Sequence, residues 1–221
     1  MIAMILAAGR GERLRPLTET TPKALVEVRG KSLLERHLDR LAAAGIETVV
    51  INLGWLGDLI AERIGSGHAY GLTVIYSPEG DNILETGGGI HRALPLLGPD
   101  PFLVVNADIY TDVPLPPAGL AGTDTGHLVL VPRPAHKERG DFDLRDGRIC
   151  ESDSAAYTFA GVAVYRPEFF AGCEPGRFPL APMLKAAARS GQLAGSVYEG
   201  MWEDVGTPER LADLNRPQDR R

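Results

Sequence analysis

Short apolar runs bounded by turn residues recur along the chain, and helical patterns lie between them. The apolar runs cover residues 2–7, 48–53, 72–76, 102–105 and 128–131. Continuous runs rich in Val, Ile and Leu are typical of strands that are buried on both faces of a sheet. The alternation of strands and helices therefore predicts an α/β fold, with a doubly wound, mostly parallel central sheet of the Rossmann-like type.

Three helices are expected between these strands. Ser32 and Glu35 have the spacing of a capping box, and leucines then repeat at helical intervals until Gly45 ends the first helix. Two further helical patterns cover residues 56–64 and 89–97. Each helix follows one of the apolar runs or leads into the next, as the alternation requires.

The second half of the chain predicts antiparallel strands in place of the strand–helix alternation. Asp146-Gly147 is a hairpin signal between residues 142–144 and 148–150. A further strand over residues 160–165 and a helix over residues 180–189 are expected after it. This half predicts a small antiparallel annex over the carboxyl edge of the sheet, where open α/β proteins bind ligands.

Composition and charge narrow the possible partners. The 221 residues include 23 Lys and Arg against 29 Asp and Glu, for a net charge of −6, which argues against broad binding to nucleic acid. No run reaches the roughly 18 apolar residues of a membrane span, and the first residues lack the basic region of a secretion signal. Cys150 and Cys173 belong to no metal motif and are expected to be free thiols. We therefore expect a cytoplasmic protein without nucleic-acid or membrane partners.

The strongest local signal is a glycine-rich turn at the end of the first predicted strand. Gly9 and Gly11 can let backbone amides approach an anion closely. Within the first 25 residues, four cations accompany only two acids, although the whole protein is acidic. The cations are Arg10, Arg13, Arg15 and Lys23. This pattern indicates a polyphosphate ligand, and the alternative is a tight turn with solvated arginines.

Two better-known phosphate loops do not fit this turn. The P-loop pattern GxxxxGK[ST] is absent from the sequence. The dinucleotide pattern GxGxxG matches at Gly9 and Gly11, but Leu14 stands where the third glycine belongs. The turn is therefore expected to bind phosphates in another way.

Two aspartates are candidate ligands for a metal. Asp108 follows the predicted strand 102–105 at the edge where a doubly wound sheet presents functional side chains. A carboxylate beside a phosphate loop suits Mg²⁺, which often takes only one or two protein ligands. The alternative is a residue that merely forms a turn. Asp204 lies between Trp202 and Val205, and taken alone it could equally be a surface acid.

Three successive glycines, residues 87–89, stand where a helix is expected to begin. Glycine costs up to about 1 kcal/mol at each position inside a helix. Close approach of this backbone to a ligand would explain the three glycines, and a flexible loop is the alternative.

Residues 6–23 (LAAGRGERLRPLTETTPK) and 202–207 (WEDVGT) resemble the signatures of sugar-1-phosphate nucleotidyltransferases. Members of this family join a nucleoside triphosphate to a sugar phosphate and release pyrophosphate. The resemblance extends over nearly the whole chain. It implies a single domain over residues 1–221, with a nucleotide-binding half at about 1–110 and a sugar-binding half at about 111–221.

The resemblance also implies roles for individual residues. Arg13 would contact the leaving pyrophosphate, Lys23 would hold the reacting phosphates, and Asp108 and Asp204 would share Mg²⁺ as the catalytic metal. The nucleotide-binding positions would be Ala8, Gly9, Gly11, Glu12, Arg13, Lys23, Glu79, Glu85, Thr86 and Gly87. The positions that contact the sugar phosphate would be Asn106, Gly140 and Glu151.

The substrates follow from the resemblance and not from the physics of single residues. The segment 84–88 (LETGG) resembles that of short bacterial members, which implies UTP and N-acetyl-α-muramate 1-phosphate as substrates in peptidoglycan recycling. Mannose 1-phosphate, glucose 1-phosphate or phosphocholine are alternative acceptors. A non-catalytic subunit that senses nucleotide sugars is an alternative of another class. The oligomeric state stays open, and a monomer is compatible with the sequence.

Overall fold

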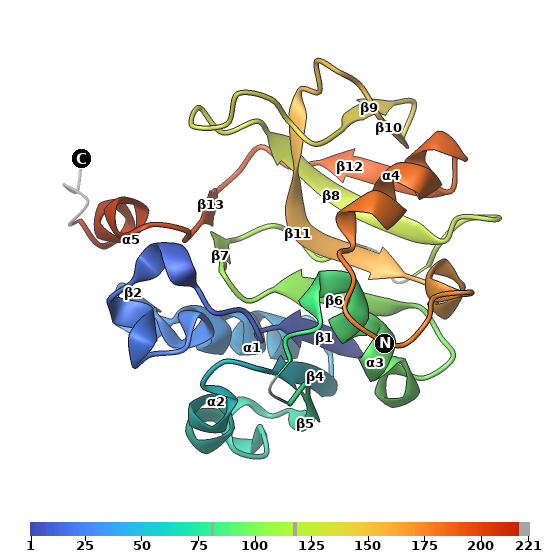
Figure 1. The fold of residues 1–221 in the computed structure, drawn as a ribbon. Coiled ribbons are helices and arrows are strands. Elements are labelled where there is room, and N and C mark those ends of the chain that lie inside the picture. Colours follow the sequence, from blue (N-terminus) through green and yellow to red (C-terminus); the bar gives the residue numbers. More distant parts are fainter. Residues whose placement is uncertain (81, 117–118, 217–221) are drawn as a thin grey trace.

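The computed structural model describes residues 1–80, 82–116 and 119–216. One nine-stranded sheet crosses the molecule in the order β5-β4-β1-β6-β11-β8-β12-β10-β9 (Figure 1). Its strands are β1 (Ala3–Leu6), β4 (Thr48–Leu53), β5 (Thr73–Pro78), β6 (Phe102–Asn106), β8 (Gly126–Pro132), β9 (Asp143–Arg145), β10 (Arg148–Cys150), β11 (Tyr157–Tyr165) and β12 (Leu193–Val197). Strands from both halves of the chain thus share one sheet.

The two halves contribute differently to this sheet. Strands β5, β4, β1 and β6 are all parallel neighbours. Strand β11 runs antiparallel to both β6 and β8, β12 is parallel to β8, and β10 pairs antiparallel with β12 and β9. The predicted doubly wound α/β fold is confirmed. The antiparallel strands mostly extend the main sheet at one side.

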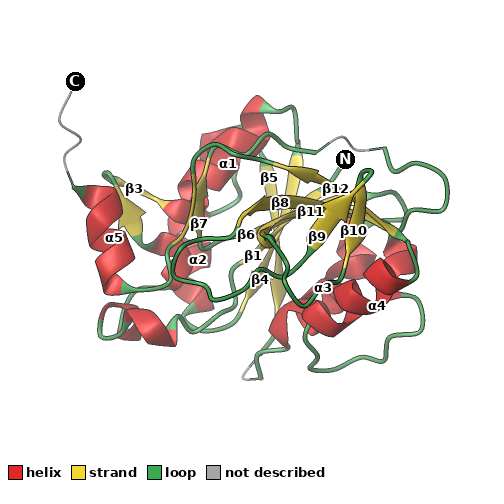
Figure 2. Ribbon diagram, turned by 90° about the horizontal axis from the view of Figure 1, so that it is seen from above, coloured by secondary structure: helices red, strands yellow, loops and turns green. Residues whose placement is uncertain are grey.

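Helices cover both faces of the sheet. They are α1 (Leu33–Ala43), α2 (Gly57–Ile64), α3 (Glu85–Leu97) and α4 (Ala181–Arg189). Alternate residues of β1 face opposite layers, because Ala3 and Ile5 pack with α1 and α2, whereas Met4 packs with α3 and α4. Figure 2 shows α3 and α4 on the other side of the sheet from α1. None of the described helices has the length and apolar character of a membrane span.

Two segments far apart in the sequence pair beside the carboxyl end of β6. Strand β7 (Ile109–Thr111) follows β6 directly and is antiparallel to β13 (Trp202–Asp204). Asp204 lies opposite Ile109, and the amide of Val205 donates to the carbonyl of Asp108 at 2.9 Å. This pair brings the two candidate metal ligands to one place. The following helix α5 (Pro208–Asn215) packs beside β2 (Glu27–Val28), which pairs with β3 (Lys31–Ser32) (Figure 1).

Helix α3 begins earlier than predicted and contains all three successive glycines. A side chain at Gly88 would place its Cβ 2.2 Å from the carbonyl oxygen of Gly176, and one at Gly87 would meet Phe178 at 2.5 Å. The amide of Gly88 donates to the carbonyl of Phe178 at 3.1 Å. The protein's own residues therefore account for the close approach: residues 176–178 at Gly87 and Gly88, and the side chains of Glu79 and Asn52 at Gly89.

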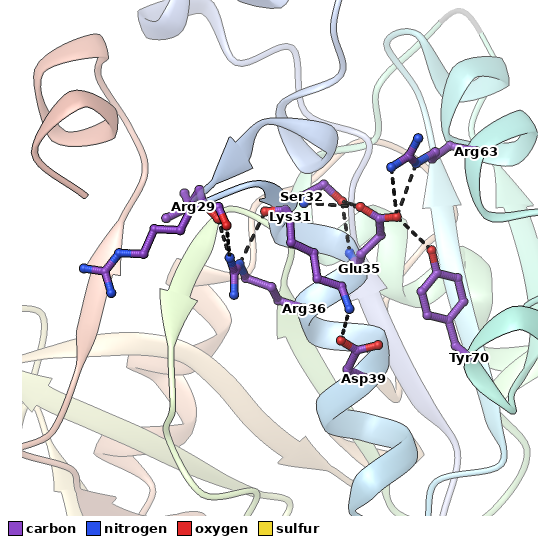
Figure 3. Close-up of polar contacts among 9 residues, drawn as sticks. Arg29, Lys31, Ser32, Glu35, Arg36, Asp39, Arg63 and Tyr70 are labelled. Atoms are coloured by element: carbon purple, nitrogen blue, oxygen red, sulfur yellow. Dashed lines mark hydrogen bonds and ion pairs between the residues drawn. The ribbon is translucent and has the colours of Figure 1, made fainter. Parts of the chain in front are cut away.

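The predicted capping box at the start of α1 is confirmed and has additional partners. The hydroxyl of Ser32 accepts from the amide of Glu35, and the Glu35 carboxylate accepts from the Ser32 amide and hydroxyl. Its second oxygen accepts from Tyr70 at 3.0 Å and from Arg63 at 3.2 Å (Figure 3). Burial alone would raise the pKa of Glu35, but the hydrogen bonds from Ser32 and Tyr70 and the charge of Arg63 outweigh it and lower that pKa.

Candidate active site

Three neighbouring cavities lie at the carboxyl edge of the sheet, and Asp108 lines all of them. The α3 cavity, of about 260 Å³, is lined among others by Ala8, Gly9, Lys23, Asn52, Glu79, Glu85, Thr86, Asn106 and Asp108. The glycine-loop cavity, of about 960 Å³, is lined among others by Gly9, Arg10, Gly11, Glu12, Arg13, Lys23, Asp108, Arg177 and Gly206. The β13 cavity, of about 160 Å³, is lined among others by Asn106, Asp108, Lys137, Thr158, Phe159, Trp202 and Asp204.

The two glycines of the N-terminal turn serve different purposes. Gly11 has a φ of 62°, in the left-handed region, and its carbonyl accepts from the hydroxyl of Thr18 at 2.8 Å. A Cβ at Gly11 would also lie 3.1 Å from the Cβ of Lys23, so this glycine lets the lysine approach. Gly9 has open space where a Cβ would point, which leaves its backbone accessible to a ligand.

A tryptophan that sequence analysis did not single out supports the same turn. The indole of Trp55 donates to the carbonyl of Thr18 at 2.9 Å. The guanidinium of Arg10 lies 5.6 Å from the centre of the indole ring, within the range of a cation–π contact. Trp55 thus fixes both the loop and one of its cations.

Lys23 and Asp108 form an ion pair at the point where the three cavities meet. The lysine side chain is 13% exposed and the aspartate side chain 35% exposed. Lys23 lines two of the cavities and Asp108 all three. The structure therefore brings together these two predicted catalytic residues, which are 85 positions apart in the sequence.

Asp204 lies in the same centre, on the side of the β13 cavity. One carboxylate oxygen forms an ion pair with Arg210 at 2.9 Å, whereas Oδ1 is buried and has no hydrogen-bond partner among the described residues. A Cβ at Gly206 would lie 2.4 Å from this oxygen and 3.0 Å from the guanidinium of Arg13. This position requires glycine, because the N-terminal loop and the C-terminal motif approach each other here.

The neighbouring Glu203 has a different environment from Asp204. Its carboxylate lies 3.8 Å from Arg210 and does not line any of the three cavities. Burial raises the pKa of Glu203 above its usual range, although Arg210 opposes that rise and Asp204 adds to it. Glu203 is therefore a neighbour of the carboxylate centre and not one of the residues that line it.

The donor set suits a divalent ion that has few protein ligands. Across the described part of the chain, no group of three or more His, Cys, Asp or Glu side chains comes together. Two carboxylates from adjacent segments face the junction, and one of their oxygens is buried and unpartnered. An ion such as Mg²⁺ commonly binds through one or two carboxylates and completes its shell with phosphate oxygens and water. Asp108 and Asp204 fit that pattern.

In the α3 cavity, Glu79 is held by partners within the protein. Its carboxylate is buried and accepts from the side chain of Asn52 at 2.7 Å and from the amide of Leu84 at 2.6 Å. Asn52 in turn accepts from the amide of Ala7 at 2.7 Å. This chain of bonds connects β1, β4 and the start of α3. Sequence analysis missed Asn52, whose signal is a single amide inside an otherwise apolar strand.

At the other side of this cavity, Glu85 adopts an uncommon backbone conformation. Its φ is 61°, and a left-handed conformation costs a residue with a side chain about 1–3 kcal/mol. Its carboxylate pairs with Arg177 at 2.8 Å. Thr86 lines the cavity as well, but Gly87 faces Phe178 and lines none of the three cavities.

Two of the residues predicted to bind the sugar phosphate lie outside the three cavities. Gly140 is buried, and a Cβ there would lie 2.3 Å from the carbonyl of Tyr157. The Glu151 carboxylate pairs with Arg189 at 2.5 Å and with Lys185 at 3.8 Å. The hydrogen bond from Arg189 lowers the pKa of Glu151. Sugar contacts at these two positions stay predictions, whereas Asn106 lines two of the cavities.

The β13 cavity contains residues that no motif indicated. Thr158 is buried, and its hydroxyl has no hydrogen-bond partner among the described residues. The indole of Trp202 donates to the carbonyl of Ala160 at 2.8 Å, so one wall is fixed to β11. Lys137 supplies a cation from the loop between β8 and β9. The cavity is thus polar, and most of its lining residues come from the second half of the chain.

The chain is similar in sequence and in fold to known proteins. The chain is 47% identical over 222 residues to the N-acetylmuramate alpha-1-phosphate uridylyltransferase of Neisseria meningitidis, with 96% of each chain covered. It is 38% identical to the protein of that name in Caulobacter vibrioides, covering 94% of this chain and 93% of the relative. The structure of HddC from Yersinia pseudotuberculosis complexed with GMP-PN has the same fold, with a TM-score of 0.77, 20% identity and coverage of 96% and 97%.

A family model described as the MobA-like NTP transferase domain matches residues 3–138. The match includes the N-terminal glycine turn, Lys23 and Asp108, and the two relatives extend the likeness to Asp204 and beyond. The resemblance to sugar-1-phosphate nucleotidyltransferases is confirmed. The chain therefore belongs to the family of MobA-like NTP transferases and is a nucleotidyltransferase.

Proposed function

We propose that this protein transfers the uridylyl group of UTP to N-acetyl-α-muramate 1-phosphate and forms UDP-N-acetylmuramate and pyrophosphate. The observation that carries the proposal is the meeting of three cavities at Asp108, beside two cations and a second carboxylate. The names of the two relatives support the choice of substrates, because the likeness covers nearly the whole chain.

Each cavity suits one part of the reaction. The α3 cavity would take the nucleoside, since it lies between β1 and α3 and has many apolar lining atoms. The glycine-loop cavity would take the triphosphate, because Arg10 and Arg13 line it beside open backbone at Gly9. The β13 cavity would take the sugar phosphate, because Asp108 lines it together with the two cavities assigned to UTP.

The chemistry asks for alignment and for neutralisation of charge. An oxygen of the sugar phosphate attacks the α-phosphorus of UTP, the bond to the β-phosphate oxygen breaks, and pyrophosphate leaves. The attacking oxygen is already anionic, so no residue has to remove a proton. Arg13 would stabilise the leaving pyrophosphate, and Lys23 would stabilise the transferred phosphate.

Asp108 and Asp204 would hold Mg²⁺ at the junction of donor and acceptor. When bound, a divalent ion neutralises negative charge on the phosphates and orients them for displacement. Lys23 and Arg210 balance the two carboxylates in the protein itself.

N-Acetylmuramate is a sugar of the bacterial cell wall, and its activation by UTP would return it to use in peptidoglycan recycling. UTP is a cytoplasmic nucleotide, which supports the expectation that the enzyme works in the cytoplasm.

The test is release of pyrophosphate with Mg²⁺, measured for UTP, GTP, CTP and dTTP against a panel of acceptors. The panel contains N-acetylmuramate 1-phosphate, mannose 1-phosphate, glucose 1-phosphate and phosphocholine, and mass spectrometry identifies the products. We expect the highest kcat/KM for UTP with N-acetylmuramate 1-phosphate. A clear preference for another pair would overturn the proposed substrates. If no pair of substrates releases pyrophosphate, a non-catalytic sensor is favoured.

A further inference from the structure

Lys137 is the only basic residue among the described residues that line the β13 cavity. It comes from the loop between β8 and β9, whereas the two carboxylates of the cavity come from elsewhere: Asp108 lies between β6 and β7, and Asp204 ends β13. Those carboxylates pair with Lys23 and Arg210. Lys137 is therefore not required to neutralise either of them.

The position of Lys137 is fixed, but its ammonium group is not saturated. The ammonium lies 3.4 Å from a carboxylate oxygen of Asp141, and the same oxygen accepts from the amide of Phe159 at 3.0 Å. Charge-assisted bonds of this kind are usually about 2.7–2.9 Å long, and an ammonium has three donors. The Lys137 side chain is 33% exposed. It is thus tethered to the wall at β11 and can still donate to a ligand.

Two other polar atoms indicate that the β13 cavity is built for a polar ligand. The hydroxyl of Thr158 and one carboxylate oxygen of Asp204 are both buried, and neither has a hydrogen-bond partner among the described residues. Both residues line this cavity. Buried polar atoms without a partner are costly. The divalent ion of the proposed function would occupy the Asp204 oxygen, which leaves the Thr158 hydroxyl for the sugar.

We infer that Lys137 determines specificity for an acidic sugar 1-phosphate by binding a carboxylate on the sugar. The inference depends on the proposed function, in which the acceptor occupies the β13 cavity. N-Acetylmuramate differs from N-acetylglucosamine by a lactyl ether on O3, which carries a carboxylate. Moving that charge out of water is unfavourable unless a cation meets it, and Lys23 and Arg210 already pair with Asp108 and Asp204. Lys137 supplies that cation.

The test compares two acceptors that differ only in this group. Steady-state rates with saturating UTP and Mg²⁺ are measured for N-acetylmuramate 1-phosphate and N-acetylglucosamine 1-phosphate, using wild type, Lys137→Met and Lys137→Arg. We expect Lys137→Met to lower the ratio of the two kcat/KM values about 10- to 100-fold, mainly through KM for the acidic sugar. Lys137→Arg keeps the charge and should restore part of the ratio.

Lys31→Met is the matched control, because Lys31 is a partly exposed lysine that pairs with an aspartate and lines none of the three cavities. It should leave both rates unchanged, and thermal unfolding reports whether each variant folds. If Lys137→Met lowers kcat/KM equally for the two acceptors, or leaves their ratio unchanged, the role of Lys137 is overturned while the proposed function still stands. A wild-type enzyme that accepts only neutral sugar phosphates would overturn the proposed acceptor together with it.

Discussion

Two carboxylate centres of this molecule connect distant segments, and they differ in how many partners they have. Both oxygens of Glu35 accept hydrogen bonds, from Ser32 on one side and from Tyr70 and Arg63 on the other (Figure 3). Asp204 has one oxygen paired with Arg210 and one buried oxygen without a partner among the described residues. A saturated carboxylate stabilises the fold, whereas an unsaturated one retains the capacity to bind a ligand.

This difference agrees with the position of each centre. Glu35 lies at the start of α1 and lines none of the three cavities, whereas Asp204 and its neighbour Asp108 lie where the cavities meet. Active sites commonly keep groups that are poorly satisfied in the free protein, at some cost in stability. We therefore expect substitutions at the two centres to affect different properties.

The largest expected effect is on turnover. Asp108→Asn removes the negative charge from the junction and should lower kcat at least about a hundredfold, the scale of losing one transition-state charge contact. The measurement is pyrophosphate release under saturating substrates. The unfolding free energy should change by less than about 1 kcal/mol, because the Asp108 side chain is partly exposed and its ion pair is screened. Near-normal turnover would remove Asp108 from the catalytic centre.

The next effect is on stability, at the other centre. Glu35→Gln replaces the carboxylate that accepts from Ser32, Tyr70 and Arg63 with a neutral amide. It should lower the free energy of unfolding by about 1–3 kcal/mol. Turnover at temperatures well below the unfolding midpoint should stay close to that of the wild type. Chemical denaturation measures the first quantity and pyrophosphate release the second.

Asp39→Asn is the control for that substitution. Asp39 lies on the same helix and pairs with Lys31, but both side chains are exposed (Figure 3). An exposed pair contributes little, so the loss should be within about 0.5 kcal/mol. Equal losses for Glu35→Gln and Asp39→Asn would contradict the claim that saturation of Glu35 stabilises the fold.

A smaller effect concerns pH. The pKa of Glu35 is lower in the folded protein than its ordinary value of 4.5, so the folded state binds this proton less readily than the unfolded state. The stabilisation by Glu35 is therefore fully present above pH 4.5 and is lost as the pH falls through the lowered pKa. The difference in unfolding free energy between wild type and Glu35→Gln should shrink in that acidic range. A difference that is constant from pH 7 to pH 3 would show that the charge of Glu35 is not the cause.

The parts of the site that local patterns encode can be predicted from the sequence. The strand end before Asp108, the glycine turn before Lys23 and the capping box at Ser32 each follow from a few neighbouring residues. Asp204 could be connected with them only through the resemblance to a family, because the pairing of its strand β13 with β7 joins residues about a hundred positions apart.

Other features depend on contacts that no local pattern records. The three glycines of α3 suggest a ligand contact, but the structure places the segment 176–178 against Gly87 and Gly88, about ninety residues further along the chain, and Glu79 and Asn52 against Gly89. Asn52, Lys137 and Thr158 belong to no motif, and their importance follows only from where the sheet places them. Burial and missing partners become visible only when the whole chain is folded.

The most direct test of the carboxylate centre is the position of a bound divalent ion. Crystals grown with UTP and Mn²⁺ in place of Mg²⁺ give an anomalous signal that locates the ion independently of the phosphates. We expect one ion at the junction of the three cavities, coordinated by carboxylate oxygens of both Asp108 and Asp204. An ion bound to the phosphates alone, with both aspartates still paired only with Lys23 and Arg210, would contradict the account.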